Sequence, residues 1–474
     1  MIIGFGVWLF TVAGLGYCVV GILARRRVLE HMATGFLIGA AALPLLLFAT
    51  SIFLDIPVLA RTAWGRAGVW IFSLLIASGV AVTAVHHARV LHTETTTRSP
   101  CTHRGGYLWI ADILLVIAIL AYLFQIFYGT RLFGHYGWDE YSFWLYAAKA
   151  LYLSSGSGTV LRQDAFATYP LGFPYLMAWC YRLTGGVSFD CVRLIAPMLT
   201  TTTCLSIYLI LRRLALTRTS ALLAVALSVW GCYPMLRLNW VGFGEIIYVD
   251  IFTLGVVYVV AWMKSRLRAD LWTAASLLGL SCFLRTDGVY MMLITVFLFV
   301  CIQLGAQRRR DLAKQWKWPT VAIVLPALLW QWFLIHYHVQ TGWMGRLSSA
   351  FLWDRMQPSF IQGTGIALWH TISNMSVYPI TIVLGFLALN ILWFRRTEFV
   401  FLISICLAQI VYLWIAYLTM FSVFEGLHAS SSERYLMRID PLTAIAFALW
   451  ADNFGASTRR VESEGAHSKA LFGD

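Results

Sequence analysis

The chain has 474 residues, of which 60% are hydrophobic and only 12% are charged, and its mean hydropathy is +0.74. Soluble domains carry about a quarter charged residues, so this composition excludes a soluble globular protein and predicts an all-α polytopic membrane protein. The formal net charge is +13, and the nine cysteines include no CxxC pair, which indicates neither a zinc site nor a disulfide framework.

Membrane-spanning helices are predicted wherever about 20 consecutive residues are mostly apolar. In chain order such runs lie near 2–24, 33–54, 67–86, 107–128, 189–211, 220–236, 243–263, 271–284, 288–305, 318–337, 368–394, 399–421 and 435–451. They predict a bundle of about thirteen spans, in which 271–284 and 288–305 can also be read as one broken pair. The predicted organisation is an N-terminal three-helix extension (1–106), a membrane module (107–451) and a short tail (452–474).

Lysine and arginine concentrate in alternate connecting segments, from Arg25–Arg27 through Arg308–Arg310 to Arg459–Arg460. Basic segments are cytoplasmic in multi-pass proteins, so we expect an exterior or periplasmic N-terminus and a cytoplasmic C-terminus in a bacterial inner membrane. The positive charge is then a topology signal, and no nucleic-acid partner is expected. The predicted outer segments include the longest loop, 129–188, and the loop 338–367.

The longest outer loop carries the adjacent carboxylates Asp139 and Glu140 after Trp138, in the stretch YGWDEYSFWLYAAKALY. The aromatic residues that follow are spaced as on a helix that lies in the membrane interface. Asp139 at the start of that helix suits an N-cap and the helix dipole. Two adjacent carboxylates also suit a general base with its orienting partner, or a divalent cation site.

The next stretch, TYPLGFPYLMAWCYRLTGG at 168–186, is too short to span a bilayer. We expect a second surface helix, entered through Tyr169 and Pro170. Its many aromatic residues indicate either simple packing or a lid that excludes water from a site.

Charged residues also occur near the outer ends of later spans. Glu245 lies at the outer end of the span 243–263, with Asp250 about one turn further in. Charged groups inside spans usually mark a pathway or a site, although Asp250 also suits a buried arginine partner. Arg285 and Asp287, in CFLRTDGVYMM, lie where two apolar runs meet. They form either a solvated turn with a local ion pair, or a site where the arginine fork faces a phosphate.

The segment before the last span, FEGLHASSSERYLMRIDPL, is crowded with charge. It contains Glu425, His428, Glu433, Arg434, Arg438 and Asp440. Arg434 and Arg438 are four residues apart and share a helix face, which suits an anionic group at the membrane boundary. The alternative is an internal salt-bridge cluster with Glu433 and Asp440.

The order of these motifs resembles the GT-C superfamily of membrane glycosyltransferases, especially the bacterial aminoarabinose transferases and protein O-mannosyltransferases. The resemblance covers 107–451 and rests on WDE, YPLGFPY, GFGE, LRTDG and ERYL. It implies a GT-C-like bundle with interfacial helices in the first long periplasmic loop, and a sugar donor carried on a polyprenyl phosphate. The chain departs from the family in having three spans before the motif-bearing helix and no large C-terminal soluble domain.

The resemblance also implies roles for individual residues. Asp139 is the expected general base, with Glu140 as its acidic neighbour and Glu245 at the second acidic position. The expected donor-phosphate ligands are Arg285, Arg434, Tyr435 and Arg438, and the expected substrate-cavity residues are Trp138, Tyr169, Glu425 and His428. No metal ligand is assigned, although Mg²⁺ or Mn²⁺ between Asp139 and Glu245 fits the family.

The expected function is the inverting transfer of a sugar from a lipid phosphate to an acceptor hydroxyl of a glycan, lipid or protein at the exterior face. The donor supplies the energy, in keeping with the absence of a P-loop or GxGxxG fingerprint from the sequence. One alternative is a lipid-linked oligosaccharide flippase or transporter, which often shows related halves with broken helices. Another is an O-antigen-type polymerase or ligase, for which Arg346 and Arg355 of a late outer loop are the candidates.

Overall fold

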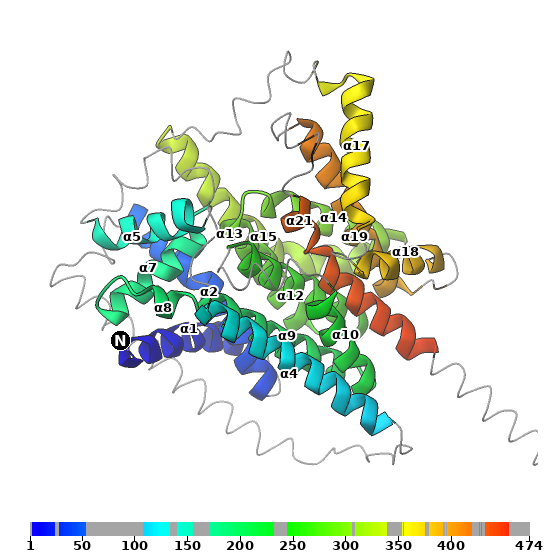
Figure 1. Ribbon diagram of the computed structural model, residues 1–474, viewed down its shortest axis with the longest axis horizontal. Coiled ribbons are helices and arrows are strands. Elements are labelled where there is room, and N and C mark those ends of the chain that lie inside the picture. The colour runs from blue at the N-terminus through cyan, green and yellow to red at the C-terminus, as the bar shows by residue number, and fades with distance from the viewer. Residues whose placement is uncertain are drawn as a thin grey trace, which may run out of the picture.

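The structure is a computed structural model, which describes residues 2–23, 28–53, 108–132, 140–154, 170–231, 244–305, 309–338, 353, 355–374, 379–391, 394, 396–419, 426, 428 and 432–454. Within these residues the chain forms helices and no strand (Figure 1). Long apolar runs form helices in lipid because a helix satisfies its backbone N–H and C=O groups internally. The predicted all-α class is confirmed for this part of the chain.

Six helices of the described part are long and apolar enough to cross a membrane: Leu29–Ser51, Trp109–Thr130, Phe189–Arg213, Gly244–Ser265, Trp318–His336 and Thr397–Thr419. Shorter apolar helices accompany them at Gly4–Val19, Arg218–Trp230, Gly288–Gln303 and Ile380–Asn390. These features are those of an all-helical membrane protein. The predicted number of about thirteen spans is not confirmed, and the predicted span 67–86 lies outside the described residues.

Helix α12 (Gly244–Ser265) lies at the centre of the bundle, against α9 (Ile195–Arg213) and α13 (Arg268–Leu284) (Figure 1). All of its apolar window is buried in protein, whereas only 17% of the window in α4 (Leu108–Leu132) is buried. Helix α4 exposes large apolar side chains such as Leu114. Because lipid tails are as apolar as leucine, α4 suits a position at the edge of the bundle and α12 forms the core.

The predicted single span 368–394 is wrong. Helix α17 (Pro358–Ile372) ends early, and a separate helix α18 begins later (Ile380–Asn390). Pro379 directly precedes α18, and proline lacks the N–H that would continue a helix arriving from α17. The other described helices are η1 (Glu140–Leu145), α5 (Tyr146–Leu153), α7 (Gly172–Thr184), α8 (Phe189–Val192), α10 (Arg218–Trp230), α14 (Gly288–Gly305), α15 (Arg309–His336), α19 (Thr397–Thr419), α21 (Ser432–Leu436) and a last helix over 439–454.

The N-terminal helices α1 (Ile2–Leu23) and α2 (Val28–Phe53) pack tightly on each other and on the rest of the bundle. A Cβ atom added at Gly16 would lie 1.5 Å from the backbone oxygen of Gly35, so only glycine permits this approach. The ring of Phe48 on α2 packs against the rings of Tyr175, Phe283 and Trp330. These two helices therefore share one core with the membrane module.

A buried ion network joins α2, α9 and α13 near the C-terminal end of α12. Arg213 donates two parallel hydrogen bonds to Asp270, of 2.8 and 2.9 Å, and its Nε lies 3.2 Å from Glu30. Tyr258 donates to the same glutamate at 3.2 Å, and Ser265 donates to Asp270 at 2.8 Å. Because buried charges are costly unless paired, this network fixes one end of α12.

Candidate functional site

The stretch with the adjacent carboxylates continues into a described helix. A π-helical turn, η1, runs directly into α5, as the aromatic spacing predicts. Buried side chains lie on one face of this helix and exposed side chains on the other. The buried ones are Trp144, Ala147, Ala148, Leu151 and Tyr152. The exposed ones are Tyr146, Lys149 and Leu153. Trp138, Asp139 and the side chain of Glu140 lie outside the described residues, so their predicted roles stay predictions.

Trp144 brings this helix next to the start of α12. Its ring lies 5.9 Å from that of Phe173 on α7. A Cβ atom added at Gly244 would lie 3.1 Å from atoms of both rings, so a glycine allows the two aromatics to approach the α12 backbone. Glu140 lies about one turn before Trp144 and Glu245 directly follows Gly244. The described helix that follows WDE in the sequence therefore packs beside the start of α12.

The predicted second surface helix is instead buried within the protein. The residues from Gly172 to Tyr181 of α7 are all buried. A Cβ atom added at Gly172 would lie 2.7 Å from the backbone oxygen of Phe283 and 2.8 Å from Leu284 Cδ2. The aromatic side chains that suggested a membrane surface pack against other helices, and the start of α7 lies beside the residue that precedes Arg285.

Arg285 is the centre of a buried ion cluster. The predicted runs 271–284 and 288–305 form two helices, α13 and α14, which Arg285–Asp287 separates; the structure fits both two short spans and one broken pair. The Arg285 side chain is 2% exposed and forms an ion pair with Glu245 through Nη1. Its Nε lies 2.9 Å from Asp287 Oδ1, and its Nη2 donates to the Tyr435 hydroxyl at 3.3 Å. Three segments of the chain thus meet at one guanidinium.

Arg438 forms the second half of the cluster. Its Nη2 pairs with Asp287 Oδ2, so that this carboxylate bridges two arginines. Its guanidinium lies 4.6 Å from the ring centroid of Tyr248 and 4.8 Å from that of Tyr435, which also lies 5.4 Å from the guanidinium of Arg285. Stacking on aromatic faces favours a desolvated guanidinium. Cations and rings therefore alternate across the site.

Asp287 is held ionised by its two partners. It lies in the turn between α13 and α14, where burial alone would raise its pKa, but the guanidiniums of Arg285 and Arg438 outweigh burial and hold the pKa at about 2. Arg438 is paired inside the protein, but its described partner is Asp287 and not the predicted Asp440. The other predicted partner, Glu433, has its side chain outside the described residues.

Arg434 differs from the other two arginines of the site. Its side chain is 31% exposed, and its contact with Glu245 is a longer one of 3.7 Å. The three arginines and two carboxylates of the cluster carry one net positive charge. Arg434 is therefore the cation that an anion arriving from outside the protein reaches first.

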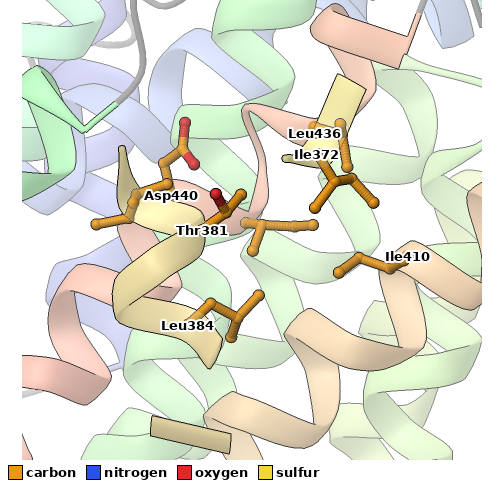
Figure 2. Close-up of a pocket in the computed structure, with 8 residues that line it drawn as sticks. Ile372, Thr381, Leu384, Ile410, Leu436 and Asp440 are labelled. Atoms are coloured by element: carbon orange, nitrogen blue, oxygen red, sulfur yellow. The ribbon is translucent and has the colours of Figure 1, made fainter. Parts of the chain in front are cut away.

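A narrow apolar cleft lies in the same region (Figure 2). It is lined by Ile372, Ile380, Thr381, Leu384, Ile410, Leu436, Ile439 and Asp440. Leu436 and Ile439 belong to the short segment that also carries Arg434 and Arg438. The two polar residues that line the cleft, Thr381 and Asp440, lie close together in Figure 2. The other lining residues are apolar.

The other predicted residues lie outside the described part of the chain, are exposed, or have described contacts elsewhere. Tyr169, Arg346 and Glu425 lie outside the described residues. His428 is exposed. Arg355 is 4% exposed and lies 4.7 Å from the ring centroid of Phe360, so it is packed within the protein. Asp250 accepts a hydrogen bond from Thr200 at 2.9 Å, so its contact is a hydroxyl and not the expected arginine.

No group of three or more His, Cys, Asp or Glu side chains able to hold a metal occurs among the described residues. Asp139 lies outside them, so the predicted Mg²⁺ or Mn²⁺ between Asp139 and Glu245 stays a prediction. Comparison with protein-family models, with curated proteins and with solved structures found no match to this chain. The resemblance to the GT-C superfamily therefore rests on the motifs themselves.

Proposed function

We propose that this protein is an integral-membrane glycosyltransferase that moves a sugar from a polyprenyl-phosphate donor to an acceptor hydroxyl. One observation carries the proposal: described residues of YPLGFPY, GFGE, LRTDG and ERYL, which are far apart in the sequence, meet near the N-terminal end of α12, and Trp144, which follows WDE in the sequence, packs beside them. The contacts are those of Trp144 with Gly244, of Gly172 with Leu284, and of Arg285 with Glu245 and Tyr435. Motifs that matched by chance would have no reason to meet in space.

The ion cluster supports the binding of an anionic headgroup. Arg434 is partly exposed, and the cluster around it has one net positive charge. An arginine fork donates two parallel hydrogen bonds to a phosphate. The phosphate of the donor lipid would bind Arg434, with Arg285 and Arg438 supplying positive potential behind it.

The carboxylates divide their roles between base and charge partner. Glu245 is engaged by Arg285 and Arg434, so it balances charge and is a poor base. Asp139, which precedes η1 in the sequence, is the proposed base that accepts the proton of the attacking hydroxyl. The new glycosidic C–O bond forms as the anomeric carbon loses its phosphate oxygen. That oxygen keeps the electron pair, and in-line attack inverts the anomeric centre.

The proposed location follows the distribution of basic residues. The ion cluster would face the periplasm or exterior of a bacterial inner membrane, and the basic connections would face the cytoplasm. The acceptor is then a hydroxyl of a cell-envelope glycan, lipid or protein. A polymerase built on Arg355 is disfavoured, because that arginine is buried against Phe360 and donates to the backbone oxygen of Tyr417.

The test is transfer from a defined donor. Purified protein is incubated with a panel of polyprenyl-phosphate sugars and candidate acceptors, and release of polyprenyl phosphate is followed. We expect release by the unaltered protein, and for Asp139→Asn a loss of about 100-fold or more, the share of a positioned base, with donor binding retained. Asp190→Asn is the matched control, because Asp190 is 80% exposed and its ion pair is with Arg193, which is not part of the cluster.

Two results would overturn the proposal. One is the absence of release with every donor and acceptor. The other is movement of lipid-linked sugar across vesicles, without transfer, that Asp139→Asn abolishes, which would identify a flippase.

A further inference from the structure

We propose that Asp287 is a positioning residue of this site, which orients Arg285 and, through it, the pair of Glu245 and Arg434. The inference rests on the proposed function. The proposed phosphate binds Arg434, and the carboxylate beside Arg434 is Glu245. We therefore place Asp287 behind the phosphate site and not in contact with it. Its effect passes through the ion pairs alone.

The geometry makes Asp287 the link between two distant parts of the chain. Its Oδ1 accepts a hydrogen bond from Arg285 Nε at 2.9 Å, and its Oδ2 forms an ion pair with Arg438 Nη2. With Nε held, the planar guanidinium of Arg285 has one orientation left, in which Nη1 reaches Glu245 and Nη2 reaches the Tyr435 hydroxyl. The carboxylate therefore sets the direction of every other contact that Arg285 makes in the cluster.

Charge strengthens the same conclusion. Arg285 and Arg438 both lie against the ring of Tyr435, at 5.4 and 4.8 Å from its centroid. Two buried guanidiniums so close repel each other unless an anion lies between them. Removing the Asp287 charge changes the net charge of the cluster from one positive charge to two. Attraction for a phosphate then rises, while the alignment of Arg285 is lost.

These opposite effects predict a divided kinetic signature. For Asp287→Asn we expect kcat for sugar transfer to fall about 10- to 100-fold, by analogy with the loss of a residue that orients a metal ligand. We expect the Kd for undecaprenyl phosphate, measured without acceptor, to be unchanged or lower. Asp287→Glu, which keeps the charge, should recover part of kcat. Arg434→Gln should show the reverse, with a higher Kd.

The experiment uses the full chain in detergent micelles, with active protein counted by bound lipid phosphate so that misfolded material does not enter kcat. Asp190→Asn is the control and should change neither parameter. An unchanged kcat for Asp287→Asn, or a Kd that weakens in step with kcat, would overturn the positioning role while leaving the glycosyltransferase proposal intact. If Asp287→Asn does not fold, Asp287→Glu alone must show a lower kcat at an unchanged Kd. A complete lack of transfer by the unaltered protein would overturn the proposed function, and this inference with it.

Discussion

Arg434 and Arg438 are the same residue type one helical turn apart, yet the structure places them in different environments. Arg438 is 1% exposed, lies between two tyrosine rings and pairs with Asp287. Arg434 is 31% exposed, and its contact with Glu245 is a longer one of 3.7 Å. One guanidinium is packed inside the protein at this point, and the other is partly exposed.

This difference predicts opposite outcomes for the same substitution. Arg438→Gln should destabilise the protein strongly, because breaking a buried ion pair by removing one partner costs about 3–5 kcal/mol. Arg434→Gln should leave the thermal midpoint nearly unchanged and weaken binding of polyprenyl phosphate about tenfold or more, since hydrogen bonds to charged groups contribute about 1.5–3 kcal/mol. Thermal unfolding and lipid-phosphate binding of each purified variant check the pair. Equal loss of stability in both would contradict the distinction.

Several residues that the sequence singled out lie together in the ion cluster, but which of them pair with each other was not predicted. Glu245, Arg285, Arg434, Tyr435 and Arg438 all lie in the cluster. The bridge between Asp287 and Arg438 could not be predicted, because the two residues are joined only by folding. Tyr248 was missed too, although its place one turn after Glu245 puts it on the same helix face.

Among the helices, the crossing of α1 and α2 depends on the absence of side chains. Both Gly16 and Gly39 lie at the contact, and a Cβ atom at Gly39 would lie 1.8 Å from the backbone oxygen of Val12. In membranes such small residues let helices approach closely enough for dense packing. Since α2 also packs on α9 and α13, forcing α1 away disturbs the helix that supports the centre.

We therefore predict that Gly16→Leu lowers the thermal midpoint of the detergent-solubilised protein markedly, because the new side chain meets the backbone of α2. Gly6→Leu is the control on the same helix, since nothing lies within 4 Å of a Cβ atom at Gly6. It should have little effect. The two variants are compared by thermal unfolding at one detergent concentration. A similar midpoint for both would show that the crossing does not limit stability.

The sequence often predicted where a helix begins and ends, but it did not predict whether the helix is buried in protein. The predicted run 288–305 coincides with α14, and 243–263 nearly coincides with α12. Hydropathy cannot tell apolar residues that face lipid from those that face protein, so α4 and α12 look alike in sequence and differ completely in burial. The same ambiguity made α7 resemble a surface helix, and Pro379 was the overlooked signal for the break before α18.

For the whole molecule, the two ends of α12 should lie on opposite sides of the membrane. His428 is exposed and shortly precedes Arg434 of the ion cluster in the sequence. Arg266 directly follows the C-terminal end of α12. We predict that a membrane-impermeant maleimide added to spheroplasts labels His428→Cys but not Arg266→Cys, relative to the parent chain with its native cysteines. Both should label after the membrane is opened. The reverse pattern would place the ion cluster on the cytoplasmic side.

Helix α12 is anchored at both of its ends. Glu245 binds Arg285 at one end, and Tyr258 and Ser265 bind Glu30 and Asp270 near the other. A slide of one helical turn, about 5.4 Å, would break both sets of contacts in the same movement. If the proposed sugar transfer takes place, we expect α12 to keep its position during the reaction and the donor lipid to reach it by lateral diffusion through the bilayer. The rate of the proposed transfer should accordingly increase with membrane fluidity and with the density of donor lipid. This is expected for an enzyme with a fixed site and not for a transporter whose halves move against each other.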